Sequence, residues 1–419
     1  MIISGLSGNE IYCLARKGLF PAELTVGNSV RSLGFAGSLG SSLKTLAGGE
    51  IEAITRMISE GRHAAIQRMT EEAQRHGAAG VAGVTSELKT LSGYTEFISQ
   101  GTAVTAPTPG RFFTTSASGT ELFCHLDAGF VPIAFVMGNV AYALGIGRGL
   151  TGGLRTMAKG EVREYSEMYN RIRHLALWRM KEEAARAGAN AVVDVKIEIR
   201  PFGPGVVELL MTGTASHHPR LAPGPVTPDR VVTSELTGPE LWNLALMGYS
   251  PADLVMATSV YSIGLVGGIG TAFSGLARGE LAELTKLIYH ARENCLELVR
   301  REASALGAER VVGNKLTIRE LSQGMIELIA TGTALRRLEG IAPASPELIP
   351  QAIIRDDDSL TLGGGGLAGL SESVRVGVAM ERQVQQRVNP LGCLVAAIVL
   401  LVVFGMVALL VVISALTGN

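Results

Sequence analysis

The feature that most constrains this chain is an internal repeat of about 105 residues that occurs three times. The second copy begins near Phe112 and ends near Ser216. In every copy a Gly-X-Glu step precedes a Gly-Glu step, and the two glutamates are 40 positions apart: 10 to 50, 121 to 161 and 240 to 280. Each copy ends on Gly-Thr-Ala, at residues 101–103, 213–215 and 332–334. Equal internal distances at three places indicate tandem copies of one fold.

Charge and cysteine usage exclude several classes of protein. The 37 basic side chains are balanced by 38 acidic ones, so the chain lacks the electrostatic signature of a nucleic-acid-binding protein. The cysteines are scattered without a C-x-x-C pair, which argues against a disulfide framework and a zinc knuckle. They are Cys13, Cys124, Cys295 and Cys393. We expect a chain that works in a reducing compartment and binds no nucleic acid.

Each repeat is expected to be an α+β unit. In the second copy, residues 131–137 are rich in side chains that favour strands, and residues 161–187 show a helical pattern. A glycine ends each long helix, at Gly77, Gly188 and Gly307. The pattern predicts a small, mostly antiparallel sheet packed on one long helix in each copy. We place the three domains at residues 1–105, 111–217 and 230–337.

The C-terminal region differs from the repeats in composition. Residues 338–390 contain several prolines and the glycine run 363–366, which is typical of a linker. The stretch 371–388 is compatible with a juxtamembrane or an oligomerising helix. Residues 391–416 carry no charge, and this run is longer than the ~20 apolar residues that cross a bilayer. We therefore expect a C-terminal transmembrane helix at 391–416.

Charges that flank this segment predict its orientation. Arg375, Arg382 and Arg387 precede the apolar run, and no basic residue follows it. By the positive-inside rule, the repeats then face the cytoplasm. The start of the chain lacks the basic residues and apolar core of a signal peptide. Together these observations predict a single-pass, tail-anchored membrane protein with its N-terminal bulk in the cytoplasm.

The order of motifs in each copy resembles a known family. The glycine after the long helix begins the segment Gly-Ala-Asn-Ala-Val-Val at 188–193, and the last strand runs into Gly-Thr-Ala. With Gly-X-X-Val at 27–30 and Ala-Arg-Glu at 291–293, these motifs resemble the YbjQ-type family, which is labelled as heavy-metal-binding. The resemblance covers all three copies and implies a dodecin-like subunit that assembles into a pentameric ring. Three fused copies and a membrane span depart from the usual member.

The residues give a metal site little independent support. Metal ions are bound by clustered cysteine, histidine and carboxylate side chains at fixed spacing. The candidate pair is Cys124 with His125, whereas the third copy has Asn243-Leu244 at this place. A metal site shared by all repeats is therefore not expected, and the cofactor stays unassigned.

Several charged positions recur in all three copies. They are Glu10, Glu121 and Glu240; Glu50, Glu161 and Glu280; Arg62, Arg173 and Arg292; and Glu72, Glu183 and Glu302. Carboxylates at helix starts are favoured by the helix dipole, and arginine suits a bidentate pair with such a carboxylate across a subunit boundary. The candidate subunit contacts are Glu50, Arg62, Glu161, Arg173, Glu280 and Arg292, with ligand binding as the alternative role. His63 and His174 align, the third copy has Glu293 there, and we expect these positions at an interface or on the surface.

No catalytic set accompanies these residues. The sequence has no Ser/His/Asp set, nucleophile elbow or Walker motif, so no enzyme is expected. The prediction is a cytoplasm-facing homo-oligomeric ring or shell, anchored in the bilayer, that acts as a structural scaffold or membrane organiser. The alternative is a protein that binds a metal or small ligand at subunit boundaries. The expected partners are copies of the same chain and the lipid bilayer, and no soluble substrate is identified.

Overall fold

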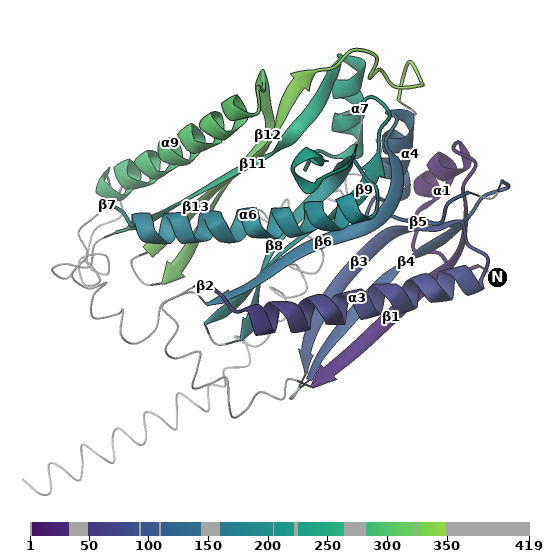
Figure 1. Cartoon of the computed structure of the whole chain (residues 1–419), viewed down its shortest axis with the longest axis horizontal. Coiled ribbons are helices and arrows are strands. Elements are labelled where there is room, and N and C mark those ends of the chain that lie inside the picture. Colours follow the sequence, from purple (N-terminus) through teal and green to yellow (C-terminus); the bar gives the residue numbers. More distant parts are fainter. Residues whose placement is uncertain are drawn as a thin grey trace, which may run out of the picture. The chain divides into compact units, whose positions relative to one another are not determined.

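The three repeats fold as α+β units, as predicted (Figure 1). The computed structural model describes residues 2–32, 49–91, 94–108, 110–143, 160–203, 205–221, 225–263, 282–322 and 325–348. All of them belong to one compact unit, Met1–Ile354. The expected transmembrane run 391–416 and the linker beyond residue 348 lie outside the described residues. Within the ranges given above, no helix is long and apolar enough to cross a membrane.

The repeats share one order of elements. In the first repeat this order is α1 (Gly8–Ala15), β1 (Phe20–Ser32), β2 (Gly49–Glu50), α3 (Glu52–Arg75), β3 (Gly80–Leu91) and β4 (Tyr94–Thr105). The second has β5 (Phe113–Thr114), α4 (Gly119–Asp127), β6 (Val131–Ala143), β7 (Gly160–Glu161), α6 (Arg163–Arg186), β8 (Ala191–Gly203) and β9 (Val206–His217). The third has the 3-10 turn η2 (Pro228–Arg230), β10 (Val232–Thr233), α7 (Gly238–Leu246), β11 (Tyr249–Ser262), α9 (Ala282–Ala305), β12 (Arg310–Ser322) and β13 (Met325–Arg337).

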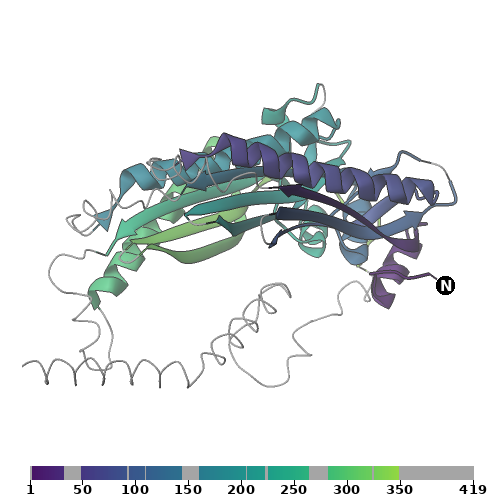
Figure 2. The ribbon, with the colours of Figure 1, turned by 90° about the horizontal axis from the view of Figure 1, so that it is seen from below.

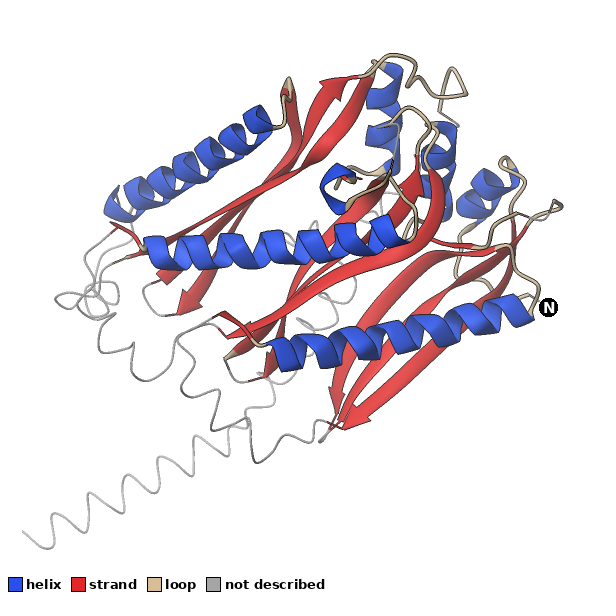
Figure 3. Ribbon diagram, viewed as in Figure 1, coloured by secondary structure: helices blue, strands red, loops and turns tan. Residues whose placement is uncertain are grey.

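Three long antiparallel strands form the body of each sheet. In the first repeat β4 lies between β1 and β3, and the same order recurs as β6-β9-β8 and as β11-β13-β12. The long helix of each repeat runs along one face of its own sheet, as the purple helix α3 does in Figure 2. Figure 3 shows this unit of one long helix over long strands three times. The predicted combination of a small antiparallel sheet with one long helix is therefore confirmed.

Short strands are exchanged between neighbouring repeats. Strand β5 of the second repeat joins the first sheet in parallel with β3, and β10 of the third repeat joins β8 in the same way. In the other direction β2 of the first repeat pairs with β6, and β7 of the second pairs with β11. Each junction therefore shares two short strands. This exchange explains why the three repeats form one compact unit.

The recurring Gly-X-Glu step is a helix cap. The Ser7 hydroxyl accepts a hydrogen bond from the backbone N–H of Glu10, and the Glu10 carboxylate accepts one from the N–H of Ser7. Such a capping box satisfies two backbone donors that the first helical turn leaves free. The same box is formed by Ser118 with Glu121 and by Thr237 with Glu240. These glutamates recur because each begins a helix.

A second recurring glutamate ties each long helix to its sheet. The carboxylates of Glu72, Glu183 and Glu302 lie near the C-terminal ends of α3, α6 and α9. They accept hydrogen bonds of 2.8, 3.1 and 3.0 Å from the backbone N–H groups of Val26, Met137 and Met256. These three acceptors therefore fix the end of the helix against the first long strand of the same repeat.

Glycine permits the closest contact between helix and sheet. A Cβ atom on Gly138 would lie 1.9 Å from the carbonyl oxygen of Ala176 and 2.7 Å from the backbone nitrogen of Met180, both on α6. A Cβ atom on Gly27 would likewise overlap backbone atoms of α3. The third repeat has Ala257 at the equivalent place, so this close approach belongs to the first two repeats.

Replacing Gly138 with alanine should destabilise the protein. The added methyl group would overlap backbone atoms of α6, and overpacking of this kind costs about 1–3 kcal/mol. Thermal unfolding followed by circular dichroism measures the change. Gly110→Ala is the matched control, because a Cβ at Gly110 meets nothing within 4 Å. Equal losses in the two variants would contradict the close helix–sheet contact.

Candidate functional site

The junction between the first two repeats contains a buried ion pair. Arg62 on α3 and Glu208 on β9 are 0% and 1% exposed. The guanidinium donates from Nε to Oε1 of Glu208 (3.1 Å) and from Nη2 to Oε2 (2.8 Å), and its Nη1 donates to the carbonyl and hydroxyl oxygens of Ser86. Removing two charges from water is costly unless the pairing is complete, as it is in this bidentate arrangement.

The junction between the second and third repeats uses the same pair of residue types. Arg173 on α6 donates from Nη2 to Oε1 of Glu327 on β13 (2.7 Å), and both side chains are buried. Thr258 donates a further hydrogen bond to the same Oε1 (3.2 Å), and Arg319 lies 3.8 Å from Oε2. The chain therefore repeats one ionic contact at equivalent places in its two junctions.

Apolar contacts surround both ion pairs. Ile54 and Ile58 of α3 share a core cluster with Ala141 of β6, which belongs to the next repeat. Helix α6 likewise packs against Leu254 and Val260 of β11. Each of these two helices therefore covers its own sheet and also the first long strand of the following repeat (Figure 1).

The predicted contact residues occupy different parts of these junctions. Arg62 and Arg173 bind carboxylates of the next repeat in the same chain, and these carboxylates lie on last strands and not at helix starts. Glu50, in β2, accepts a 2.7 Å hydrogen bond from Arg179 of the second repeat, and Glu161 in β7 lies opposite Tyr261 of β11. Arg292 is exposed on α9, and the predicted contact at position 280 lies outside the described residues.

Breaking one buried ion pair should destabilise the junction strongly. In Glu208→Gln the charge of Arg62 stays buried without a counter-charge, and we expect a loss of about 3–5 kcal/mol in denaturant unfolding. The double variant Arg62→Met/Glu208→Leu removes both charges and should recover most of this loss. The exposed pair Arg31–Glu60 provides the control, because Glu60→Gln should cost less than about 1 kcal/mol. Equal costs at the two pairs would refute a structural role for the buried one.

An aspartate with a strained backbone, Asp194, lies near the junction of the first two repeats. Asp194 in β8 has a φ of 55°, where the equivalent residues of the other repeats are Gly83 and Gly313 with φ of 66° and 64°. Residues other than glycine rarely adopt this left-handed conformation. The buried Asp194 carboxylate accepts a 2.8 Å hydrogen bond from Ser116 and lies 3.4 Å from Nζ of Lys196, and burial raises its pKa to about 6. Strain at one position is often linked to function.

A pocket of about 270 Å³ lies beside this cluster. The second repeat contributes Ser116, Glu121 and Lys196 to its lining, and the first contributes Glu10 and Thr102. Charged groups of both signs converge here from two repeats. The pocket is therefore the best candidate for a small-ligand site in the described part of the chain.

Asp194 should make stability depend on pH. Its pKa in the folded chain, about 6, is above the ordinary 3.8, so the folded chain binds a proton more tightly than the unfolded chain between these values. The protonated Asp194 therefore stabilises the folded chain at low pH, and this stabilisation is lost as the pH rises through 6. The loss in the free energy of unfolding is up to about 3 kcal/mol, at 1.36 kcal/mol per pKa unit.

Thermal unfolding of Asp194→Asn and of the wild type at pH 4 and pH 7 measures this contribution. We expect the variant to gain stability relative to the wild type as the pH rises. The pKa of Glu302 is raised to about 7 by burial, but this carboxyl group titrates in both proteins and cancels from the difference. A difference that does not change with pH would contradict the assignment.

Both candidate metal ligands are buried, and Cys124 lies in an apolar cluster. Burial raises the pKa of Cys124 to about 12 and lowers that of His125 to about 4, and neither ring nitrogen of His125 has a hydrogen-bond partner within the described residues. The thiols of Cys13 and Cys124 lie in the same cluster, and protonated thiols are poor metal ligands. In the parts of the chain that the structure describes, no three His, Cys, Asp or Glu side chains could hold one ion. These residues do not fit a heavy-metal site.

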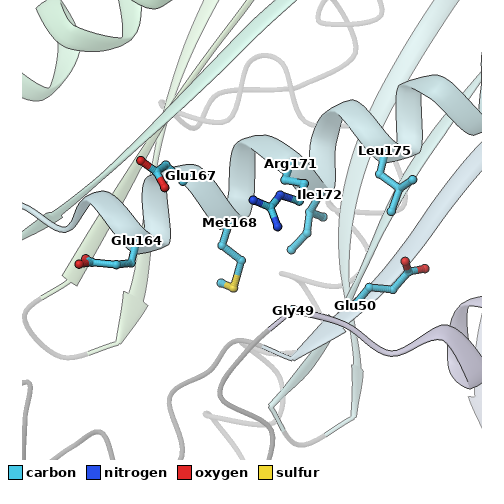
Figure 4. Close-up of a pocket in the computed structure, with 8 residues that line it drawn as sticks. All are labelled: Gly49, Glu50, Glu164, Glu167, Met168, Arg171, Ile172 and Leu175. Carbon is cyan, nitrogen blue, oxygen red and sulfur yellow. The ribbon is translucent and has the colours of Figure 1, made fainter.

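Another pocket, of about 410 Å³, lies between β2 and α6 (Figure 4). Met168, Ile172 and Leu175 project from α6 on the side of β2, and Glu50 and Arg171 add opposite charges to the lining. This mixture of apolar and oppositely charged groups does not define a class of ligand.

The fold and the junctions define a class: tandem α+β repeats that exchange short strands and are joined by buried Arg–Glu pairs. The family model YbjQ, described as "Putative heavy-metal-binding", matches residues 21–107, 132–218 and 249–337. The chain belongs to this family and contains three tandem copies of its domain. The matches begin after the first helix of each repeat, so α1, α4 and α7 lie outside them.

Relatives of two kinds resemble the chain. An encapsulin nanocompartment protein of Mycobacterium tuberculosis is 34% identical over 226 residues, which is 51% of this chain and 84% of the relative. A UPF0145 protein of Methanoregula boonei is 42% identical over 83 residues, 20% of this chain and 69% of the relative. A UPF0145 protein of Vibrio campbellii is 42% identical over 80 residues, 19% of this chain and 77% of the relative.

Sequence reasoning missed the acidic partners of the buried arginines. A signal for them was present, because a glutamate precedes Gly-Thr-Ala by five positions in every copy: 96 to 101, 208 to 213 and 327 to 332. Asp194 was also missed. Its signal was the exchange of Gly83 and Gly313 for an aspartate in the second copy alone.

Proposed function

We propose that this protein is a tail-anchored, cytoplasm-facing homo-oligomer that acts as a structural scaffold at the membrane, with no catalytic role. The main support for the proposal is that both junctions between successive repeats have the same arrangement. The ion pairs Arg62–Glu208 and Arg173–Glu327 lie at equivalent places in them. An interface of this head-to-tail kind favours the addition of further copies by the same rule, into a ring or another closed assembly. The apolar run 391–416 would attach each chain to the bilayer, and several anchors in one assembly would bind by avidity.

The relatives support an assembly of many chains. One relative carries the name of an encapsulin nanocompartment protein, and the likeness covers most of its length. We propose by this likeness that the present chain contributes to a ring or a closed protein shell. Its partners would be copies of itself or of a shell protein.

The mass of the full chain in detergent tests the proposed assembly. We expect one discrete species of several chains at micromolar concentration in mass photometry. A chain that ends after Pro390 should form the same species without detergent, because the compact unit Met1–Ile354 is retained. A monomer in both preparations would refute the scaffold.

The anchor has a separate test. Val402→Arg/Met406→Arg places two charges in the middle of the apolar run, where each costs about 2.5–3.5 kcal/mol. We expect this variant to leave the membrane fraction after carbonate extraction, whereas the wild type stays. Ser373→Arg, before the apolar run, is the control and should behave as the wild type. Equal retention of all three proteins would contradict a transmembrane anchor.

A second candidate function is the binding of a small ligand at the junction of the first two repeats. The strained Asp194, beside a pocket that contains Lys196, favours it. Native mass spectrometry of the purified protein would show a bound species that Lys196→Met releases. A mass equal to that of the bare chain, before and after incubation with cell metabolites, would contradict this function.

A further inference from the structure

We infer that two copies of this chain join head to tail, the third repeat of one copy covering the first repeat of the next in the register of the internal junctions. The head surface comprises residues 2–8, β1 and β4, and the tail surface comprises α9 and β12. The inference rests on the proposed homo-oligomer and identifies the surfaces that would build it.

Equivalent positions in the three repeats follow from fixed offsets. The first and second repeats differ by 111 positions before the last hairpin and by 112 after it, as Gly27 and Gly138 or Gly101 and Gly213 show. The second and third repeats differ by 119 throughout, as Gly213 and Gly332 show. Any contact inside the chain can therefore be transferred to the two free ends.

The head surface leaves apolar side chains of β1 in solvent. Leu24, Val26 and Val30 are 41%, 46% and 57% exposed. The equivalent residues are 5% exposed or less: Phe135, Met137 and Ala141 in the second repeat and Leu254, Met256 and Val260 in the third. In those repeats the long helix of the preceding repeat packs on the first long strand. Among the described residues, no long helix besides α3 of the same repeat packs on β1. A second copy would supply the helix that covers these exposed side chains.

The two ends carry the separated halves of a third ion pair. Arg292 holds the place of Arg173 on its helix, and Glu96 holds the place of Glu208 on its strand. Arg292 is exposed and Glu96 is half-buried, and no ion pair of either is found among the described residues. Joined in the internal register, the tail arginine meets the head glutamate.

A second charge pair follows from the same register. Lys181 of α6 forms an ion pair with Asp253 of β11 across the second junction. The equivalent residues at the free ends are Arg300 on the tail and Glu23 on the head. Both are exposed, and their charges are opposite.

The exposed N-terminal isoleucines fit the edge of the tail sheet. Ile2 and Ile3 hold the places of β5 and β10, the short strands that join the sheet of the preceding repeat. Strand β12 forms an edge of the third sheet in the described structure. In the inferred register Ile2 lies beside Arg310, as Val232 lies beside Ala191. Addition of a strand to an exposed edge is a common mode of recognition between proteins.

Gly8 leaves room for the tail. A Cβ atom on Gly119 would lie 2.6 Å from Cβ of Glu10, and one on Gly238 would lie 2.8 Å from Cα of Glu121. A Cβ on Gly8 would meet nothing within 4 Å. The first helix of the third repeat, with Glu240 at the equivalent position, would fill this space in the assembly.

In the inferred register, Glu293 should make the junction between chains weaker than the two junctions inside the chain. His63 forms a 3.0 Å contact with Glu183, and His174 lies 3.8 Å from Glu302. The tail has Glu293 at this place, and the head presents Glu72, so two carboxylates face each other. Glu293→Gln should therefore strengthen association between chains.

Five variants of the full chain in detergent, studied by sedimentation over a range of concentrations, test the inferred register. Glu96→Arg and Arg292→Glu should each weaken association at least tenfold, and the double variant should recover it. Gly8→Ala should weaken association as well, because its methyl group meets the partner and not the chain itself. Arg301→Glu, on the exposed side of α9, is the control and should leave association unchanged.

The outcomes separate this inference from the proposed function. A monomeric wild type would refute both. A wild-type oligomer that persists in Glu96→Arg and Arg292→Glu would overturn the head-to-tail register and leave a homo-oligomer that uses another surface. Loss of association in the single variants without recovery in the double variant would also overturn it. Unfolding midpoints equal to the wild type show that each variant is folded.

Discussion

The buried pair of arginine and glutamate decides how one repeat can lie on the next. An apolar helix face tolerates small shifts along a strand, because hydrophobic contact has no direction. The guanidinium of Arg62 does not tolerate such shifts, because it is shielded from water and must reach both carboxylate oxygens of Glu208 and the backbone carbonyl of Ser86. A shift would leave charges buried and unpaired, which is far more costly than a loosened apolar contact. The pair is therefore satisfied in one register only, and the exchanged short strands pair in that same register.

Neighbour contacts of this kind make the stability of the array depend on its junctions. In a repeat protein each unit buries only part of its apolar surface, and the adjacent unit buries the remainder. The first long strand of each repeat shows this directly. Most side chains of β6 and β11 are buried, whereas many side chains of the equivalent strand β1 are exposed. Arrays of this type usually have polar capping units at their ends. The first repeat of this chain has no such polar surface on β1, where Leu24, Val26 and Val30 are exposed.

Local sequence signals were enough to predict most of the secondary structure of each repeat. The contacts between residues far apart in the sequence could not be predicted from such signals. The long helix α6, which ends just before Gly188, and the strands around it follow from periodicity and turn residues within one copy. The partner of Arg62 is 146 positions away, and a single sequence does not show which glutamate of the next repeat it meets. Adjacent positions on a helix also point in different directions, so the sequence neighbours Cys124 and His125 did not define a shared site. The strain at Asp194 is a property of φ and becomes visible in sequence only by comparison of the copies.

In the proposed assembly, the fusion of three domains would give contacts of two strengths. Inside the chain, His63 and Lys181 each meet a carboxylate of the next repeat, and the covalent link keeps these partners at high effective concentration. Between chains, the inferred register keeps the charge pair of Arg292 but places Glu293 opposite another carboxylate. By this inference the same fold would form a permanent junction inside the chain and a reversible junction between chains. An array built from single domains would have equal junctions throughout, whereas an array of this chain in the inferred register would have a different junction after every third domain.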